Sequence, residues 1–309
     1  MKEKAIITAA ITGSIHTPGM SEYLPVTPQE IADDAVRAYE AGAAVCHIHA
    51  RDPKTGQPSS DINLFKEAIT KIKSRCDMVI CITTGGGLGM TAEQRLVGVS
   101  TFKPELGSFN AGSINFALFH ALERYKNFKF DWESKYLAMT EDYIFPNTFK
   151  SMKDFARIFN ENGTKPEFEV YDSGMVNNIA FMIDRGYVKK PVYIQYVMGV
   201  LGGITPSPEN VMFLVDYTKR LIGEGNFEFS VCVAGRAQFP ICTQSLLIGG
   251  NARVGLEDNL YLEKGRMAKS NAEQVTKIVR IAREFGIEPA TPDEARKILG
   301  LKGIDKVNY

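Results

Sequence analysis

The sequence lacks the features typical of membrane, nucleic-acid-binding and disulfide-stabilised proteins. No apolar run in its 309 residues approaches the length that a bilayer span needs. Lysine plus arginine equals aspartate plus glutamate, 36 each, so the net charge gives no electrostatic reason to expect a nucleic-acid or membrane partner. The five cysteines are odd in number and contain no CxxC motif, which favours reduced thiols. The sequence therefore predicts a cytoplasmic protein.

What the chain does have is a regular alternation of two patterns. Short apolar runs rich in Val, Ile and Phe alternate with longer segments of helical spacing, which predicts a parallel sheet with crossover helices. Eight such runs favour an α/β fold of the (β/α)8 TIM-barrel type, formed as one domain by residues 1–309. A doubly wound open sheet is the alternative. The predicted strands are 4–12, 43–50, 78–84, 106–111, 167–172, 192–198, 227–234 and 251–257, and the predicted helices are 27–41, 61–75, 91–99, 175–186, 207–223 and 269–285.

Polar and glycine-rich motifs stand at the carboxyl end of nearly every predicted strand. "ITGS", "HIHARD", "TTGGG", "SFNAG" and "LEDN" are among them. A barrel brings these ends into one ring, which is where the active sites of such barrels lie. The motifs therefore favour the barrel over the open sheet and predict the functional site at its mouth.

The connection between the fourth and fifth predicted strands is longer than one barrel helix requires. Residues 117–150 within it contain the only tryptophan and much of the aromatic content. We expect an inserted segment here that serves as a lid over the barrel mouth or as an oligomer contact.

Two of the only four histidines, His47 and His49, stand one residue apart in an apolar run. Side chains two apart on a strand point the same way, so this pair can bind one metal ion at adjacent positions. Glu257 ends the eighth strand, which adjoins the first strand of a closed barrel, and it is the best candidate for a third ligand. Two histidines and one glutamate leave a position open for substrate, as in catalytic zinc sites. The alternatives are a structural hydrogen-bonding role for the histidines and, for Glu257, a cap or an ion pair with Arg253.

The chain contains, in this order, the seven motifs "TAAITG", "HIHARD", "ITTGG", "KPELGSFNAGSINF", "EFEVYDSGM", "GGITPSPEN" and "NARVGLEDNLYLEKGRMAKSNAEQV". In these motifs and their order the sequence resembles the β-keto acid cleavage enzymes, and the resemblance spans nearly all of the chain except the long insertion. The resemblance implies a (β/α)8 barrel, a catalytic divalent metal that is usually Zn²⁺, and a homotetramer. It also implies the reaction of a β-keto acid with acetyl-CoA to give acetoacetate and a new acyl-CoA.

Matching the motifs residue by residue gives each site residue an expected role. The resemblance implies metal ligands at His47, His49 and Glu257, and a catalytic pair of Arg253 and Asp258. The positions that would hold the substrate's oxygen atoms or line its pocket are Thr83, Thr84, Gly85, Gly86, Ser108, Asn110 and Glu169, with His16 as a further polar group.

One position departs from the family members that act on 3-keto-5-aminohexanoate. After "ITG" those members carry a glutamate suited to the substrate's ammonium group, whereas this chain has Ile15. A buried ammonium without a counter-charge is costly. We therefore expect a β-keto acid without an amino group at its fifth carbon. Beside Ile15, His16 either contributes a polar group to the pocket or only stabilises its loop.

Other functions are compatible with the same residues. A zinc-dependent aldolase-type lyase or a hydrolase on a TIM barrel is an alternative enzyme, and a non-catalytic metal-binding barrel is a third possibility that leaves Arg253 and Asp258 unexplained. The "TTGGGLG" loop lacks the Lys-Ser/Thr of a P-loop, which favours close backbone approach to substrate over nucleotide binding. Arg236 in "AGR" either binds a phosphate of CoA or forms a salt bridge at the barrel end.

Overall fold

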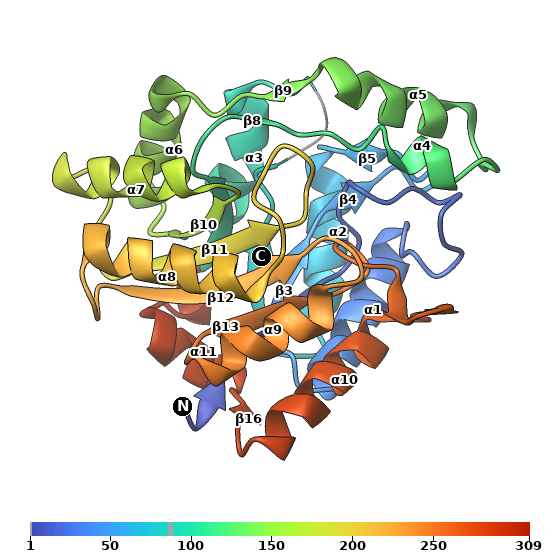
Figure 1. Ribbon diagram of the computed structural model, residues 1–309. Coiled ribbons are helices and arrows are strands. Elements are labelled where there is room, and N and C mark those ends of the chain that lie inside the picture. Colours follow the sequence, from blue (N-terminus) through green and yellow to red (C-terminus); the bar gives the residue numbers. More distant parts are fainter. Residues whose placement is uncertain (1, 86–88) are drawn as a thin grey trace.

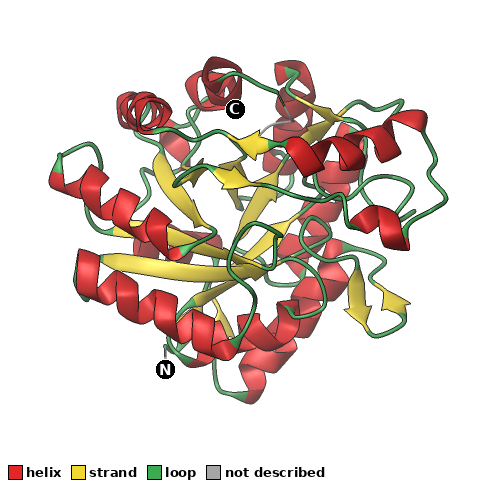
Figure 2. Cartoon of the chain, turned by 45° about the horizontal axis from the view of Figure 1, so that its top comes forward, coloured by secondary structure: helices red, strands yellow, loops and turns green. Residues whose placement is uncertain are grey.

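The eight apolar runs form a closed barrel of parallel strands. The computed structural model describes residues 2–85 and 89–309; the predicted pocket residue Gly86 lies outside them. Helices surround the barrel (Figures 1 and 2). Pairing of β13 with β2 closes the ring, with Arg253 opposite Thr8, so the barrel prediction is confirmed and the open sheet is wrong. The barrel strands are β2 (Ile7–Ala10), β3 (Val45–Ile48), β6 (Val79–Ile82), β7 (Leu106–Asn110), β10 (Lys165–Val170), β11 (Val192–Met198), β12 (Phe227–Val233) and β13 (Asn251–Val254).

The helices that follow the strands begin at local sequence signals. Thr27 caps α1 through a capping box with Glu30, and Pro28 occupies the first turn. All six predicted helices are present, with ends within a few residues of the prediction. Three others were not predicted: α6, α9, whose first turn contains Pro240, and the short α11. The helices are α1 (Pro28–Glu40), α2 (Ile62–Lys73), α3 (Ala92–Phe102), α6 (Phe149–Glu161), α7 (Ser173–Asp184), α8 (Pro208–Ile222), α9 (Gln238–Leu247), α10 (Asn271–Glu284) and α11 (Pro292–Leu299).

Alternation of side chains along the strands divides the barrel interior into layers. The layer at the amino ends of the strands is apolar and includes Val45, Val79 and Leu106. Ala295 and Leu299 of α11 pack against it, so α11 seals this end of the barrel. The polar side chains of the interior lie above this layer, towards the carboxyl ends of the strands, where the motifs predict the site.

The long connection after β7 folds as a separate layer at the top of Figure 1. Arg95 of α3 fixes its end, since the guanidinium donates to the Pro146 carbonyl at 3.1 Å and to Asn147 Oδ1 at 2.7 Å. The same side chain donates to the Thr84 carbonyl at 2.6 Å, which ties the connection to the loop after β6. Its elements are β8 (Ile114–Asn115), α4 (Ala121–Arg124), α5 (Asp131–Met139), η1 (Thr140–Asp142) and β9 (Ile144–Phe145), with β8 antiparallel to β9.

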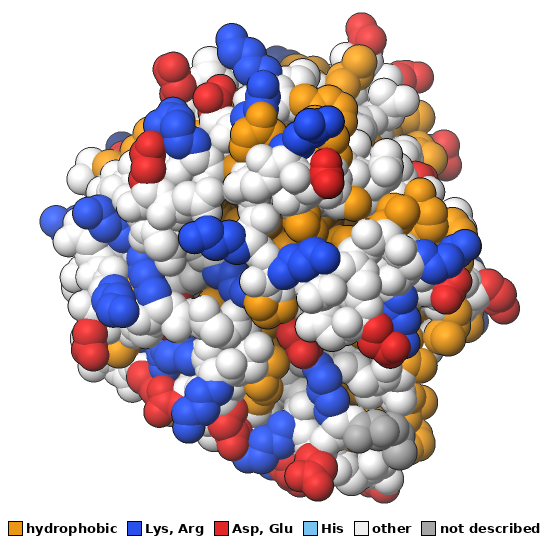
Figure 3. Space-filling model, turned by 90° about the vertical axis from the view of Figure 1, so that its left-hand side faces the viewer, with side chains coloured by type: hydrophobic (Ala, Val, Ile, Leu, Met, Phe, Trp, Pro, Cys, Tyr) orange, Lys and Arg blue, Asp and Glu red, His pale blue; other side chains and the backbone are white. Residues whose placement is uncertain are grey.

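Smaller elements complete the molecule outside the barrel. Among the described residues no helix is both long and apolar enough to cross a membrane. Figure 3 shows side chains of both charge signs interspersed over one face of the molecule, in keeping with the net charge of zero. The remaining elements are the parallel pair β1 (Lys4–Ala5) and β16 (Glu288–Pro289), the hairpins β4 (Ala50–Arg51) with β5 (Pro58–Ser59) and β14 (Tyr261–Glu263) with β15 (Arg266–Met267), and η2 (Ile304–Lys306).

Candidate active site

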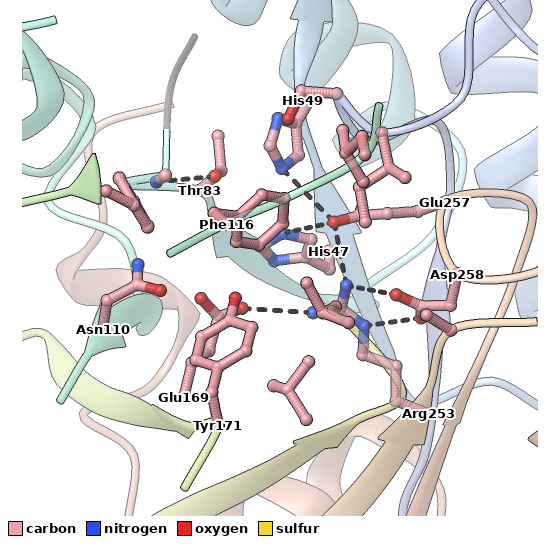
Figure 4. A pocket seen from close by; sticks show the side chains of 18 of the residues that line it. His47, His49, Thr83, Asn110, Phe116, Glu169, Tyr171, Arg253, Glu257 and Asp258 are labelled. Atoms are coloured by element: carbon pink, nitrogen blue, oxygen red, sulfur yellow. Dashed lines mark hydrogen bonds and ion pairs between the residues drawn. The ribbon is translucent and has the colours of Figure 1, made fainter. Parts of the chain in front are cut away.

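His47, His49 and Glu257 come together at the mouth of the barrel. His47 lies in β3, His49 directly follows it, and Glu257 follows β13 on the other side of β2. The Nε2 atoms of both histidines lie 3.5 Å from Glu257 Oε1 (Figure 4). All three side chains are buried, and their potential ligand atoms lie within 4.8 Å of one another. The predicted trio is thus assembled by the fold, from strands that are neighbours in space and far apart in the sequence.

Two glycines allow Glu257 to approach the histidines. Gly13 has φ +59°, and a Cβ there would lie 2.2 Å from Glu257 Cγ. Gly255 has φ +153°, and a Cβ there would lie 2.1 Å from the Ala10 carbonyl oxygen. Both positions require glycine for reasons of backbone conformation and space. The loop after β13 can therefore lie directly against β2, which brings Glu257 Oε1 within 3.5 Å of both histidines.

Arg253 joins three carboxylates in the same cluster. Its Nε and Nη2 donate to the two carboxylate oxygens of Asp258, both at 2.9 Å. Nη2 also donates to Glu257 Oε1 at 2.8 Å, and Nη1 lies 3.4 Å from Glu169 Oε1. When all three carboxylates are ionised, one guanidinium leaves two negative charges uncompensated. A divalent cation would neutralise this buried excess.

The protein environment raises the pKa of two of these carboxyl groups and lowers the pKa of the third and of a neighbouring histidine. Burial raises the pKa of Asp258 to about 6, with the charge of Arg253 opposing the rise and that of Glu257 adding to it. Burial also raises the pKa of Glu169 to about 8, against the attraction of Arg253. Burial disfavours the charged form of Glu257, but Arg253 and His47 outweigh it and hold the pKa well below its usual range. Burial lowers the pKa of His47 despite the nearby Glu257 charge. An ionised carboxylate beside a neutral imidazole is the protonation state that metal ligands require.

The donor atoms of this trio fit a divalent metal. Glu257 Oε2 is buried and has no hydrogen-bond partner in the described part of the chain. A second group, His47 with Cys81 and Glu167, also lies within 4.8 Å. Its thiol donates to Glu167 at 3.4 Å, and burial raises the pKa of Cys81 well above its ordinary value. A protonated thiol is a poor ligand, so the trio at the mouth is the better metal site.

The structure brings four of the predicted substrate-binding residues into the cavity beside the histidines. Thr83, Gly85, Asn110 and Glu169 line it. Thr83 Oγ1 accepts a hydrogen bond from the Gly85 amide at 3.0 Å. Its hydroxyl donates to no residue in the described part of the chain, so its proton is available to a ligand. Neither polar atom of the buried Asn110 amide has a partner among the described residues. These two side chains are therefore available to hydrogen-bond a bound molecule.

The other predicted pocket residues lie further from the centre of the cavity. Ser108 and Thr84 are buried and bonded to each other: the Thr84 amide donates to Ser108 Oγ at 3.0 Å, and Thr84 Oγ1 donates to the Ser108 carbonyl at 2.7 Å. His16 Nδ1 lies 2.8 Å from the Leu256 carbonyl oxygen, to which it must donate. This bond favours the loop-stabilising role of His16, whose ring lines a neighbouring cavity.

Arg51 and several pocket residues were not predicted to belong to the site. Arg51 of the "HIHARD" motif is fully buried and donates to the carbonyls of Thr12, His16 and Gly56, each at 2.8 Å. It thereby fixes the loop that carries Ile15. The aromatic content of the insertion was the sequence signal for Tyr136, Tyr143 and Phe145. Side chains that line the cavity without having been predicted are Ser14, Phe116, Leu118, Tyr136, Tyr143, Phe145, Tyr171, Val197, Val200 and Ala234.

Comparison with known proteins agrees with the motifs. The model of the β-keto acid cleavage enzyme family matches residues 4–301. A 3,5-dioxohexanoate:acetyl-CoA acetone transferase of Paraburkholderia graminis is 46% identical over 308 residues, which cover 100% of this chain and 99% of that protein. A 3-keto-5-aminohexanoate cleavage enzyme of Acetoanaerobium sticklandii is 39% identical over 300 residues, 97% of this chain and 99% of that protein.

A solved structure supports the fold from a greater distance. The apo structure of ObcA superposes with a TM-score of 0.73 at 20% identity, covering 92% of this chain and 66% of that chain. At this identity the likeness concerns the fold alone. The family match over nearly the whole sequence and the relatives of full length together show that this chain belongs to the β-keto acid cleavage enzyme family.

Proposed function

We propose that this protein cleaves a β-keto acid with acetyl-CoA, giving acetoacetate and a new acyl-CoA, with a divalent metal held by His47, His49 and Glu257. The observation that carries the proposal is the buried cluster of these three side chains with Arg253 and Asp258 at the barrel mouth. One of the relatives named above has acetyl-CoA in its name, and the other is named for the cleavage of 3-keto-5-aminohexanoate. Zn²⁺ suits the two imidazoles and one carboxylate best.

Asp258 is the proposed general base. Its two oxygens lie against Arg253, which holds the carboxylate in place and favours its ionised form. A base with a pKa of about 6 is ionised at neutral pH and still accepts a proton. A bound metal would act as a Lewis acid that stabilises the enolate of the β-keto acid. Arg253 is placed to stabilise the oxyanions that form later.

The reaction then proceeds in two carbon–carbon bond steps. Asp258 takes a proton from the carbon between the carboxylate and the keto group, and this carbon attacks the acetyl carbonyl and expels the CoA thiolate. The thiolate attacks the original keto carbon, and the bond between that carbon and the carbanion carbon breaks. Asp258 returns the proton to the departing carbon, which yields acetoacetate. No electron is gained or lost, so no redox cofactor is required.

Hydroxyl and amide groups of the pocket are proposed to hold the substrate's oxygens. Thr83 and Asn110 have free hydrogen-bonding capacity towards the cavity, and we assign them to the carboxylate and keto oxygens. Ser108, Thr84 and Gly85 form the supporting wall. Glu169, whose pKa burial raises to about 8, is protonated at neutral pH and can donate one further hydrogen bond.

The preferred substrate has an uncharged chain beyond its keto group. Ile15 lines the cavity together with the aromatic side chains Phe116, Tyr136 and Tyr143. The carboxylates of the cavity, those of Glu169, Glu257 and Asp258, all contact Arg253, so none is free for an ammonium group. The relative from P. graminis is named for 3,5-dioxohexanoate, which has an oxygen at the fifth carbon. We propose this compound, or a similar neutral β-keto acid, as the substrate.

The segment 117–150 is proposed to act as a lid within the single domain formed by residues 1–309. Leu118, Tyr136, Tyr143 and Phe145 of this segment line the cavity that contains the histidines. A cover of this kind excludes water from a carbanion that would otherwise be protonated.

Assembly and compartment are proposed from the family resemblance and the surface. We infer a homo-oligomer, a tetramer as the resemblance implies. Apolar side chains that are 40% exposed or more lie on α6, α7 and α8, among them Phe149 and Phe181, whose rings are in contact with centroids 5.4 Å apart. All five cysteines are free, which fits the reducing cytoplasm. Light scattering of the purified protein tests the tetramer.

The proposed function is tested by following acyl-CoA formation from neutral β-keto acids, with and without a chelator. We expect turnover that requires acetyl-CoA, stops when the metal is removed and returns when Zn²⁺ is added. Cleavage that proceeds equally well without acetyl-CoA would instead indicate an aldolase-type lyase or a hydrolase. Activity that is indifferent to the chelator, in protein that contains no stoichiometric metal, would exclude the metal site.

A further inference from the structure

A second, larger cavity joins the first beside the proposed base. It measures about 700 Å³. Asp258 lines both cavities. The other residues that line both are Ile15, Leu118, Val200 and Ala234. A molecule seated in the second cavity thus reaches the reacting carbon of the β-keto acid from the side of Asp258.

The inner wall of the second cavity is apolar. Met20, Leu137, Phe239, Leu260 and Leu262 line it and are themselves buried. They come from the loop after β2, from α5, from α9, from the residue before β14 and from β14 itself. Such a wall suits a long, thin and uncharged chain.

The rim of the same cavity carries unpaired positive charge. Arg124, Arg236 and Lys264 line it and are exposed, and none forms an ion pair within residues 2–85 and 89–309. The two acids that line the cavity are already occupied, since Asp258 binds Arg253 and Glu263 lies 3.3 Å from Arg266. The rim is therefore basic although the whole chain has no net charge.

Aromatic side chains stand beside these cations. The Arg124 guanidinium lies over the Tyr261 ring at 4.8 Å and over the Tyr125 ring at 5.5 Å, and both tyrosines line the cavity. Flat rings next to a guanidinium are suited to stacking a nucleobase. The second cavity thus combines an apolar interior with a basic and aromatic rim.

We propose that this cavity binds acetyl-CoA, with the thioester at Asp258, the pantetheine arm along the apolar wall and the phosphates at Arg124, Arg236 and Lys264. The proposal rests on the proposed function, which requires acetyl-CoA beside the β-keto acid. It also decides between the two roles expected of Arg236, because this guanidinium has no carboxylate partner among the described residues. Contact with a phosphate is the role that remains.

The test compares acetyl-CoA with acetyl-pantetheine, which has the same thioester and arm but no phosphate or nucleotide. The variant combines Arg124→Gln, Arg236→Gln and Lys264→Gln, all at exposed positions. The matched control is Lys297→Gln, an exposed lysine of α11 at the opposite end of the barrel. Steady-state kinetics give KM for each donor and for the β-keto acid, and calorimetry measures CoA binding without turnover.

The triple variant should raise KM for acetyl-CoA and weaken CoA binding by roughly tenfold or more, as loss of several charge-assisted contacts predicts. Its KM for acetyl-pantetheine, its KM for the β-keto acid and its kcat should stay within about twofold of the control. An unchanged KM for acetyl-CoA, or equal losses with both donors, would overturn the assignment. If the natural protein turns over neither donor, the proposed reaction fails; CoA binding that is lost in the triple variant would then still support the site.

Discussion

At the scale of single residues, Arg253 determines most of the site's electrostatics. It contacts Asp258, Glu257 and Glu169 at once, and it keeps Glu257 ionised although that carboxylate is buried. Burial lowers the pKa of Arg253, but Asp258 and Glu257 raise it well above its ordinary value, so the guanidinium stays charged. Its removal would leave several buried carboxylates without a counter-ion.

Replacement of Asp258 by asparagine should separate chemistry from metal binding. The asparagine amide would keep the shape of the side chain but accept no proton, and we expect kcat to fall about a hundredfold or more. Metal content, measured by elemental analysis, should stay stoichiometric because Asp258 is not among the proposed ligands. Near-normal turnover in this variant would mean that another residue is the general base.

Ile15 should control the choice of substrate. Ile15→Glu places an anion in a cavity whose other carboxylates are bound to Arg253, so the preference for 3-keto-5-aminohexanoate over a neutral β-keto acid should rise by about tenfold or more in kcat/KM. The control is Ile15→Gln, which has nearly the same size without the charge. Competition of the two substrates in one pot measures the ratio. If the natural protein already prefers the amino substrate tenfold, Ile15 does not have the role assigned to it.

His16 should make the protein less stable in acid. Burial lowers the pKa of His16 to about 4, against the hydrogen bond to Leu256. In the unfolded chain the pKa is near 6.5, so below that pH the unfolded state binds the proton first. The contribution of the neutral His16 ring to the free energy of unfolding is complete above pH 6.5 and is lost as the pH falls towards 4. At pH 5 the loss is about 1–2 kcal/mol.

Thermal unfolding of His16→Asn tests this account of His16. The asparagine amide can donate to the Leu256 carbonyl but does not titrate, so the variant should lose less stability than the natural protein between pH 7 and pH 5. Identical losses in both proteins would mean that His16 titrates in the folded state as it does in water.

At the scale of elements, the site depends on where the loops after β2 and β13 meet. Gly13 in the first loop leaves room for Glu257 in the second. Asn271 at the start of α10 connects the two loops, since its amide donates to the Ile11 carbonyl at 2.9 Å and accepts from the Leu256 amide at 2.8 Å. The position of the third ligand is thus set by packing between two segments about 240 residues apart in the chain.

Gly13→Ala should therefore disturb the metal site. Its Cβ would meet the Glu257 side chain at 2.2 Å, and its φ of +59° is unfavourable for alanine. We expect metal affinity to fall at least about tenfold and activity to fall with it, as for loss of a well-placed ligand. Gly174→Ala is the matched control because nothing lies within 4 Å of a Cβ at that position. Titration with Zn²⁺ under a competing chelator compares the two, and equal affinities would show that Glu257 tolerates the displacement.

At the scale of the whole molecule, the sequence predicted the barrel and the three clustered polar residues because both follow from local patterns. Strand periodicity places His47 and His49 on the same side of their strand, and closure of the eight strands into a barrel brings Glu257 next to them. The positions of Tyr136 and Tyr143 in the cavity could not be predicted, because they depend on how the insertion folds back over the barrel. The second cavity is formed by side chains from several segments, among them the loop after β2, α4, α5, α9 and the β14–β15 hairpin. No single motif specifies this combination.

The central claim is that this site joins the acetyl group of acetyl-CoA to the carboxyl end of a β-keto acid whose remaining chain is uncharged. Acetyl-CoA labelled with ¹³C in both acetyl carbons, reacted with unlabelled 3,5-dioxohexanoate, tests this most directly by mass spectrometry of the products. The account predicts acetoacetate that carries both labelled carbons and an acetoacetyl-CoA that carries none. Label in the acyl-CoA product, or unlabelled acetoacetate formed without consumption of acetyl-CoA, would contradict it.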